Sequence, residues 1–203
     1  MPITGLTGDV GAGKSTLCAV WAAHGAHIID ADTVAREQWD IPEVQAEAEK
    51  RWGSGFFTGT HKEIWKKIAE KIFSDKEEYK FASALIQQRT VRQIKALACA
   101  AQGVVVVELP LLFEGAHESW LSYVIYAAAP FEKRVERNAR RHWDASEVLR
   151  RDGNLLPQQV KIAKADLVLE NNGTAKAWRE KAEGCWPVLV AVASGRKGRK
   201  VQS

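Results

Sequence analysis

The chain has 203 residues, a formal net charge of +4, 46% hydrophobic residues and 27% charged residues. This length suits one domain, or one domain with inserted lobes, and the composition excludes wholesale disorder. No apolar run approaches the roughly 18 residues of a membrane-spanning helix, so we expect no membrane partner. The opening MPITGLTGDVGAGK lacks the basic and then apolar stretches of a secretory signal, so we expect none.

The cysteines indicate a reducing compartment, and the excess positive charge lies in the C-terminal stretch. Cys18, Cys99 and Cys185 lie far apart and are odd in number, which suits neither a disulfide framework nor a zinc site, so we expect reduced thiols in a cytoplasmic protein. Four basic residues lie in the C-terminal stretch 195–203. Without them Lys+Arg falls from 29 to 25 and equals Asp+Glu, which gives little reason to expect a nucleic-acid partner.

Predicted strands and helices alternate along the chain. A strand, a turn, a helix and a second strand within the first 30 residues favour a parallel α/β sheet. The five predicted strands cover residues 3–7, 27–30, 104–108, 122–127 and 166–169. The predicted helices cover residues 14–24, 33–39, 42–50, 61–73 and 76–102, a basic segment opened by Pro130, and 174–184, after which Pro187 is expected to interrupt the helix.

The first turn carries a phosphate-binding motif. Residues 8–15, GDVGAGKS, match G-x-x-x-x-G-K-[ST], with the predicted strand before it and the predicted helix after it. Glycines let the backbone wrap a phosphate with its N–H groups inward, and the helix N-terminus faces the same anion. In this motif Lys14 reaches the β- and γ-phosphates, the Ser15 hydroxyl ligates Mg²⁺, and Thr16 lies near the α-phosphate. The chain has no N-K-x-D base-reading motif, so we favour ATP over GTP.

An acidic turn, Asp30-Ala31-Asp32, follows the second predicted strand. Ligands of open parallel sheets bind beyond the carboxyl ends of strands, where a carboxylate can accept the proton of an attacking hydroxyl. If the segment stays extended, Asp30 and Asp32 point the same way. The alternative is that Asp32 caps the helix predicted to begin near Thr33.

Further charged side chains follow the middle strands. Glu108 ends the VVVV strand, at a position where such proteins often hold an acid near Mg²⁺, and Glu114 is a candidate for the substrate side. Within residues 133–141, five basic residues face a single acid, Glu136, so local pairing does not explain them. They suit a lid that clamps a phosphoryl group, and the alternative is a solvated helix face. The five are Lys133, Arg134, Arg137, Arg140 and Arg141.

These motifs, taken in order, resemble the dephospho-CoA kinase family. The segments that carry the resemblance are GLTGDVGAGKST (5–16), IIDADTVAR (28–36), IFSDKEE (72–78), LPLLFE (109–114) and ADLVLENNG (165–173). The resemblance spans residues 3–173 and implies a three-layer P-loop kinase fold with a parallel core sheet, a helical substrate lobe and a small lid. On this basis we place the core at 1–32, 103–130 and 160–185, the substrate lobe at 33–102, the lid at 131–159 and a basic tail at 195–203.

The resemblance also implies an activity and a set of site residues. The activity is transfer of a phosphoryl group from ATP, with Mg²⁺, to the ribose 3′-hydroxyl of dephospho-CoA, by a monomer or small homo-oligomer. Asp32, Lys14 and the lid residue Arg140 are the catalytic candidates. The ATP-binding candidates are Gly11, Ala12, Gly13, Lys14, Ser15, Thr16, Arg137, Arg141, Asn171 and Asn172, the last two near adenine. The substrate-binding candidates are Asp32, Leu109, Pro110 and Glu114, and Ser15 is the metal ligand.

The chain departs from the family pattern at two places, and one of them keeps another function open. Asp9 stands where the family usually has a second loop glycine, and Ser83-Ala84 replaces its usual His-Pro. The second departure leaves a P-loop kinase for another nucleotide-like or small hydroxylated metabolite as the alternative. A nucleotide-dependent binding protein that uses its basic tail is a third hypothesis, but such a protein has no need of the carboxylate of Asp32.

Overall fold

The computed structural model describes residues 2–115, 117–153 and 155–196. The chain forms two compact units, one made of the residues up to 30 and from 97 onward, the other of residues 31–96. Of the predicted basic tail, Arg196 is described, whereas Lys197, Arg199 and Lys200 lie outside the described residues.

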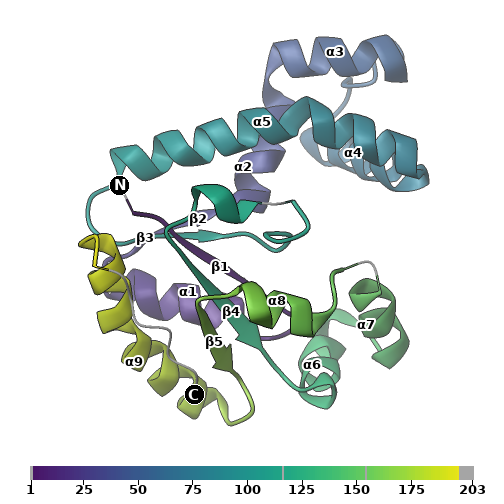
Figure 1. The fold of residues 1–203 in the computed structure, drawn as a ribbon. Coiled ribbons are helices and arrows are strands. Elements are labelled where there is room, and N and C mark those ends of the chain that lie inside the picture. Colours follow the sequence, from purple (N-terminus) through teal and green to yellow (C-terminus); the bar gives the residue numbers. More distant parts are fainter. Residues whose placement is uncertain (1, 116, 154, 197–203) are drawn as a thin grey trace. The chain divides into compact units, whose positions relative to one another are not determined.

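A five-stranded parallel sheet forms the centre of the first unit (Figure 1). Its order is β2-β3-β1-β4-β5, with β1 at Thr4–Gly8, β2 at His27–Asp30, β3 at Val105–Glu108, β4 at Tyr123–Ala128 and β5 at Leu167–Glu170. All neighbouring strands pair in parallel. The predicted α/β fold with five parallel strands is therefore confirmed. Because every strand runs the same way, the segments that leave β1, β2 and β3 all emerge at one edge of the sheet.

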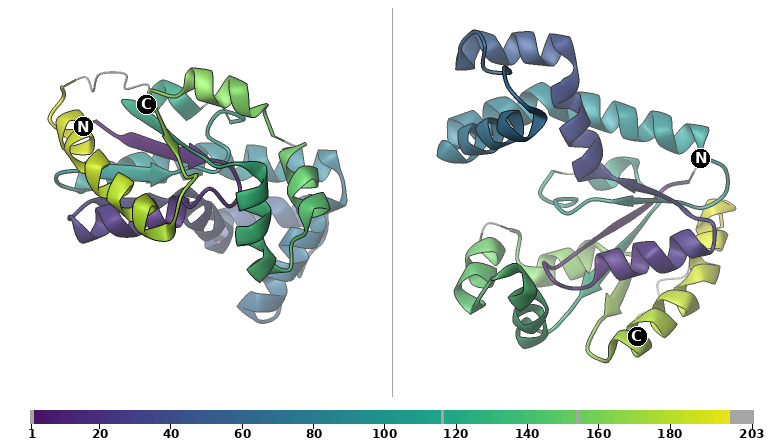
Figure 2. Two further views of the ribbon diagram at one scale, coloured as in Figure 1. Left: turned by 90° about the horizontal axis from the view of Figure 1, so that it is seen from below. Right: turned by 180° about the vertical axis from the view of Figure 1, so that it is seen from behind.

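Two helices cover one face of this sheet (Figure 2). They are α1, Lys14–Ala23, and α9, Ala175–Ala193, which pack against each other and against β1. Trp21 of α1 is fully buried and its indole N–H donates to the Ala182 carbonyl of α9 at 2.9 Å. A hydrogen-bonded indole between two helices fixes their spacing, and thereby the place at which α1 begins beside β1.

Helix α9 corrects one prediction. Pro187 lies inside the helix and does not end it. Proline removes one backbone hydrogen bond and costs a helix interior about 3 kcal/mol. On either side of it, however, Cys185, Leu189 and Val192 are buried in the same core. Burial of this continuous apolar face outweighs the missing bond, so the helix continues to Ala193.

The other face of the sheet carries elements that the sequence did not reveal. Helix α8, Gln158–Lys164, crosses this face over β4 and β5 (Figures 1 and 2). Helix α7, Ala145–Asp152, precedes it and was also missed. The basic helix expected after Pro130 is present as α6, Phe131–Asn138, followed by a 3-10 turn at Ala139–Arg141. A short 3-10 segment, His117–Trp120, precedes β4.

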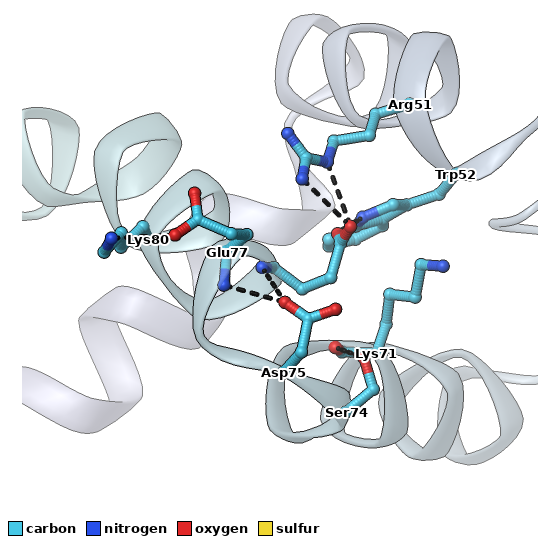
Figure 3. A network of polar contacts seen from close by, with 8 residues as sticks. Arg51, Trp52, Lys71, Ser74, Asp75, Glu77 and Lys80 are labelled. Carbon is cyan, nitrogen blue, oxygen red and sulfur yellow. Dashed lines mark hydrogen bonds and ion pairs between the residues drawn. The ribbon is translucent and has the colours of Figure 1, made fainter.

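The second unit is helical. It contains α2, Ala31–Glu37, a 3-10 turn at Gln38–Asp40, α3, Pro42–Trp52, α4, His61–Ser74, and most of α5, Lys76–Ala100. Its core gathers apolar and aromatic side chains around Trp39 and Ile68, with Trp39 stacked on Trp52 at 5.3 Å. A polar network closes this unit (Figure 3): the side chains of Arg51 and Trp52 both donate to the Glu78 carboxylate, at 3.1 and 2.7 Å. Trp52 is therefore a packing residue of this unit.

None of the described helices combines the length and apolar character that crossing a membrane requires.

Candidate active site

The phosphate-binding loop joins β1 to α1. Its last glycine, Gly13, is the N-cap of α1 with φ at 92°, and no side chain caps the helix there. A side chain on Gly13 would come within 2.8 Å of Asn171 and Trp178, so both the conformation and the space require glycine. The N–H groups in the first turn of a helix have no carbonyl partner within the helix. The loop therefore ends in a set of backbone donors suited to an anion.

Side chains from distant parts of the chain hold the loop carbonyls. Three successive carbonyls each accept a hydrogen bond from a side chain outside the loop. The pairs are Arg137 to Gly11 at 3.4 Å, Asn171 to Ala12 at 2.8 Å and Trp178 to Gly13 at 3.0 Å. Arg137 in turn donates to the Asn171 carbonyl and side-chain oxygen at 3.1 and 3.0 Å. With its carbonyls held outward in this way, the loop is fixed before any ligand binds.

Lys14, the first residue of α1, turns back over the loop. Its ammonium group donates to the carbonyls of Gly8 and Asp9 at 3.1 and 3.2 Å. Burial lowers its pKa below 10.5, an effect partly opposed by the negative charges of Glu108 and Asp9 and reinforced by the positive charge of Lys161. A bound anion would favour the charged form of this amine.

Two oxygen-bearing side chains of the kind that bind Mg²⁺ lie near Lys14, those of Ser15 and Glu108. Ser15 is exposed, and with Thr16 it borders an open cavity of about 440 Å³ along α1 and α9. Glu108 is half-buried at the end of β3, close enough for its charge to act on Lys14. Among the described residues, no cluster of three His, Cys, Asp or Glu side chains forms a complete metal site. A hydroxyl and a carboxylate beside a phosphate loop nevertheless fit Mg²⁺, which takes few protein ligands and completes its shell with phosphate and water.

Asp9 stands where the family usually has glycine. It is 3% exposed, and its carboxylate accepts three hydrogen bonds. It has no positive φ, so its backbone does not require glycine. Its carboxylate accepts from the Tyr126 hydroxyl, from Gln158 Nε2 at 2.6 Å and from the Ala129 N–H at 3.4 Å. The hydrogen bond to Asp9 and burial both raise the pKa of Tyr126 above its usual value, burial being the larger cause. Asp9 thus ties the loop to β4 and α8.

The acidic turn differs from its expected form. Strand β2 ends at Asp30, which pairs in register with Glu108, and α2 begins at once with Ala31. The extended alternation predicted for Asp30 and Asp32 is therefore wrong, because the segment is already helical. Asp32 is exposed in the first turn of α2 and is not its cap. A carboxylate at this position is stabilised as an anion by the helix dipole.

The lid arginines have different partners. Arg134 is 6% exposed and forms a two-pronged ion pair with Asp152 of α7, at 2.9 and 2.7 Å, so it is a structural residue of the lid. Arg137 is held by the loop and Asn171, as described above. Arg140 and Arg141 are exposed, and Arg141 lies over the Trp143 ring at 5.4 Å. Positions 134, 137 and 141 are spaced to share one face of a continuous helix, but α6 ends at Asn138, so Arg141 lies beyond it in the 3-10 turn.

The remaining predicted residues lie around β3 and β5. Leu109 is buried and its N–H donates to the Leu6 carbonyl at 2.9 Å, while the Pro110 carbonyl accepts from the Thr7 hydroxyl at 3.3 Å. Glu114 accepts from the Leu156 N–H at 3.1 Å, which joins the segment after β3 to the segment before α8. Asn171 is buried among loop contacts, whereas the exposed Asn172 donates to Glu170 at 3.0 Å.

Several residues of the site were missed by sequence reasoning. Trp178, Tyr126, Gln158 and Lys161 come from α9, β4 and α8, more than 110 positions from the loop that they surround. None of them lies in a motif with a chemical signature. Among the residues that hold the loop, Arg137 was singled out through the basic cluster and Asn171 through the family resemblance.

Comparisons with known proteins agree with this geometry. A family model described as dephospho-CoA kinase matches residues 2–177. A dephospho-CoA kinase from Deinococcus radiodurans is 34% identical over 178 residues, which is 85% of each chain. A crystal structure of a Thermus thermophilus protein superposes with a TM-score of 0.78 at 30% identity, covering 91% of this chain and 95% of the other. A dephospho-CoA kinase structure from Campylobacter jejuni shares the fold, with a TM-score of 0.67, 23% identity and coverage of 95% and 98%.

Proposed function

The chain belongs to the dephospho-CoA kinase family and is a kinase of coenzyme A biosynthesis, and we propose that it phosphorylates the ribose 3′-hydroxyl of dephospho-CoA with ATP through the groups described above. The observation that carries the assignment of the ATP site is the loop at residues 8–15, whose carbonyls are held outward while an uncapped helix begins beneath it. Such a loop binds the β- and γ-phosphates through backbone N–H groups.

Lys14 and Asp32 have the two chemical roles of the transfer. Lys14 exchanges the loop carbonyls for phosphate oxygens and offsets the negative charge of the transferring group. Asp32 orients the ribose hydroxyl and accepts its proton as the oxygen attacks the γ-phosphorus, and the ADP oxygen leaves on the opposite side. An exposed carboxylate two residues after the end of β2 is accessible to a substrate.

The metal and the lid complete the proposed site. Ser15 is the proposed Mg²⁺ ligand, and Glu108 is placed to help through water. Bound Mg²⁺ would neutralise charge on the β- and γ-phosphate oxygens. Arg140 is the proposed clamp on the transferring group, since it is exposed, and Arg141 is proposed to contact ATP. Arg137 supports the loop backbone and reaches ATP from there, and Asn172 remains the proposed neighbour of adenine.

The substrate side is proposed to involve Leu109, Pro110 and Glu114 together with Asp32. The contact of Glu114 with the Leu156 N–H would tie substrate binding to the segment that leads into α8. The protein is proposed to act in the cytoplasm as a monomer or small homo-oligomer, with dephospho-CoA as a small-molecule partner and no nucleic-acid partner.

A coupled ADP-release assay tests this function. The wild type is given Mg·ATP with dephospho-CoA, adenosine, AMP or other small hydroxyl compounds, and the product is identified by mass. We expect strong preference for dephospho-CoA, and no turnover by folded protein would overturn the assignment. Asp32→Asn should lower kcat by about 10²- to 10⁴-fold with little change in ATP affinity. Glu37→Gln, an exposed substitution on the same helix, serves as the control and should behave as wild type.

A further inference from the structure

Helix α8 carries a buried cation that the functions assigned above do not use. Lys161 is 5% exposed. Within the described part of the chain, its ammonium group has no carboxylate or carbonyl acceptor, and it lies over the Tyr126 ring, at 5.7 Å from nitrogen to centroid. A ring contact of this length is a weak interaction, so within the protein this ammonium group has no strong partner and can receive an anionic ligand.

The acidic groups near Lys161 are already engaged. Asp9 accepts from Tyr126, Gln158 and the Ala129 N–H. Asp152 is taken up by the two-pronged pair with Arg134. Neither carboxylate forms an ion pair with Lys161.

Lys161 also acts on the phosphate-binding loop. Its positive charge is one of the causes that lower the pKa of Lys14, so the two amines share one environment. The negative charges of Glu108 and Asp9 act on Lys14 in the opposite sense, and a bound phosphate would reduce the repulsion between the two amines further. The loop that binds phosphate is the element that could supply such an anion once nucleotide is present.

The position of Lys161 is fixed through its own helix. Gln158 is the first residue of α8, and its Nε2 donates a hydrogen bond to the Asp9 carboxylate at 2.6 Å. Residues three apart on a helix lie on the same face, so Gln158 and Lys161 both face the loop. Asp9 thereby sets the distance between the loop and α8.

We propose that Lys161 is a second phosphate-binding lysine of this kinase, whose ammonium group contacts phosphate oxygens of the nucleotide beside Lys14. This proposal rests on the assignment of residues 8–15 as the ATP-phosphate loop. In it, Asp9 and Gln158 are positioning residues, which act by holding α8 against the loop.

The test compares Lys161→Met, which keeps the length and apolar stem, with Lys161→Arg, which keeps the charge, and with Lys164→Met. Lys164 is an exposed lysine on the same helix and is the matched control. Three quantities are measured for each: thermal midpoint without ligand, affinity for Mg·ATP and for Mg·tripolyphosphate, and kcat. Tripolyphosphate isolates the phosphate contacts from those of adenine.

We expect Lys161→Met to weaken both ligands about 10- to 100-fold and to lower kcat by about 10²-fold, as for loss of one charged donor at a phosphoryl group. Its thermal midpoint without ligand should stay close to that of wild type, because the ammonium group forms no ion pair within the protein. Lys161→Arg should recover most of the affinity, and Lys164→Met should match wild type.

Either of two results would overturn the proposal. One is unchanged affinity for both ligands in Lys161→Met. The other is a lower thermal midpoint without ligand together with a loss of affinity that Lys161→Arg does not recover, which would make Lys161 a packing residue. If wild type binds Mg·ATP through Lys161 but does not phosphorylate dephospho-CoA, the proposed function fails while this inference stands.

Discussion

The carboxylate of Asp9 accepts a hydrogen bond from Gln158 Nε2 at 2.6 Å, and so joins the phosphate-binding loop to a helix 149 positions later in the chain. The same carboxylate accepts from the Tyr126 hydroxyl, and Asp9 and Tyr126 are both buried. A position where the family usually has glycine thus holds a buried carboxylate with three donors. The substitution adds a tether to the loop without straining its backbone.

Replacing Asp9 by glycine should therefore destabilise this protein. Asp9→Gly leaves the Tyr126 hydroxyl and the Gln158 amide without their buried acceptor, and we expect a loss of about 2–4 kcal/mol in the free energy of unfolding. Urea denaturation followed by tryptophan fluorescence measures this loss. Tyr126→Phe removes one donor and should cost less. In the double variant the two losses should not add, because the residues share one bond. An Asp9→Gly variant as stable as wild type would show that the tether contributes nothing.

The sequence was sufficient to predict the elements that repeat a strong local pattern. The loop at residues 8–15 follows a buried strand, the helix from Lys14 follows that loop, and the strand at 27–30 follows the turn at Gly25. The helix through Pro187 was missed, because a local breaker was outweighed by the burial of Leu189 and Val192 in the core. Helices α7 and α8 were missed, because with 8 and 7 residues they are too short to show a clear helical periodicity.

The candidate site was predictable only where one motif holds all its residues. Lys14, Ser15 and Thr16 follow from the loop pattern itself. The supports of that loop, such as Trp178 and Gln158, are ordinary residues whose role arises from contacts across the fold. No spacing along the chain encodes such contacts, so a single sequence cannot reveal them. The same reason explains why Arg134 was grouped with the phosphate clamps, although Asp152 engages it.

Gly8 and Gly25 allow the cost of a steric clash to be compared with the cost of a strained backbone conformation. Gly8 has φ at 153°, and a Cβ there would lie 2.2 Å from the Ala127 carbonyl oxygen of β4. Because backbone atoms of a central strand cannot move aside, Gly8→Ala should prevent folding or cost more than about 3 kcal/mol. Gly25, with φ at 92° and no atom within 4 Å, is the control. Gly25→Ala should cost only about 1 kcal/mol of strain. Equal thermal midpoints for the two variants would contradict this reasoning.

The three thiols should differ strongly in reactivity. Cys99 is exposed, whereas burial raises the pKa of Cys185 to about 12 and also raises that of Cys18, which donates to Glu108 at 3.4 Å. Thiolates are the reactive form, so at about pH 8 we expect one fast-reacting thiol in the folded protein. A disulfide-exchange reagent with absorbance detection gives the count, and adding denaturant should expose the other two. In Cys99→Ser the fast phase should vanish, and its persistence would place the reactive thiol elsewhere.

The lowered pKa of Lys14 predicts a pH dependence for nucleotide binding. In the unfolded chain Lys14 has a pKa of 10.5, and burial lowers it in the folded protein. Between the two values the unfolded state binds more protons, so the contribution of Lys14 to stability rises with pH in that window. Bound phosphate favours the charged amine and reverses the shift, so binding in that window takes up a proton. The affinity for Mg·ATP should therefore fall as pH rises through the lowered pKa.

Calorimetry detects this proton directly. As the pH is raised toward 10.5, the heat of Mg·ATP binding to wild type should come to vary with the ionisation enthalpy of the buffer, because the proton comes from the buffer. Lys14→Arg is the control, since its guanidinium stays protonated across the range and its binding heat should be the same in each buffer. Lys14→Met should bind Mg·ATP too weakly to measure. Wild-type heats that do not depend on the buffer would mean that the amine of Lys14 is already fully charged before phosphate arrives, and the link between its burial and nucleotide binding would be lost.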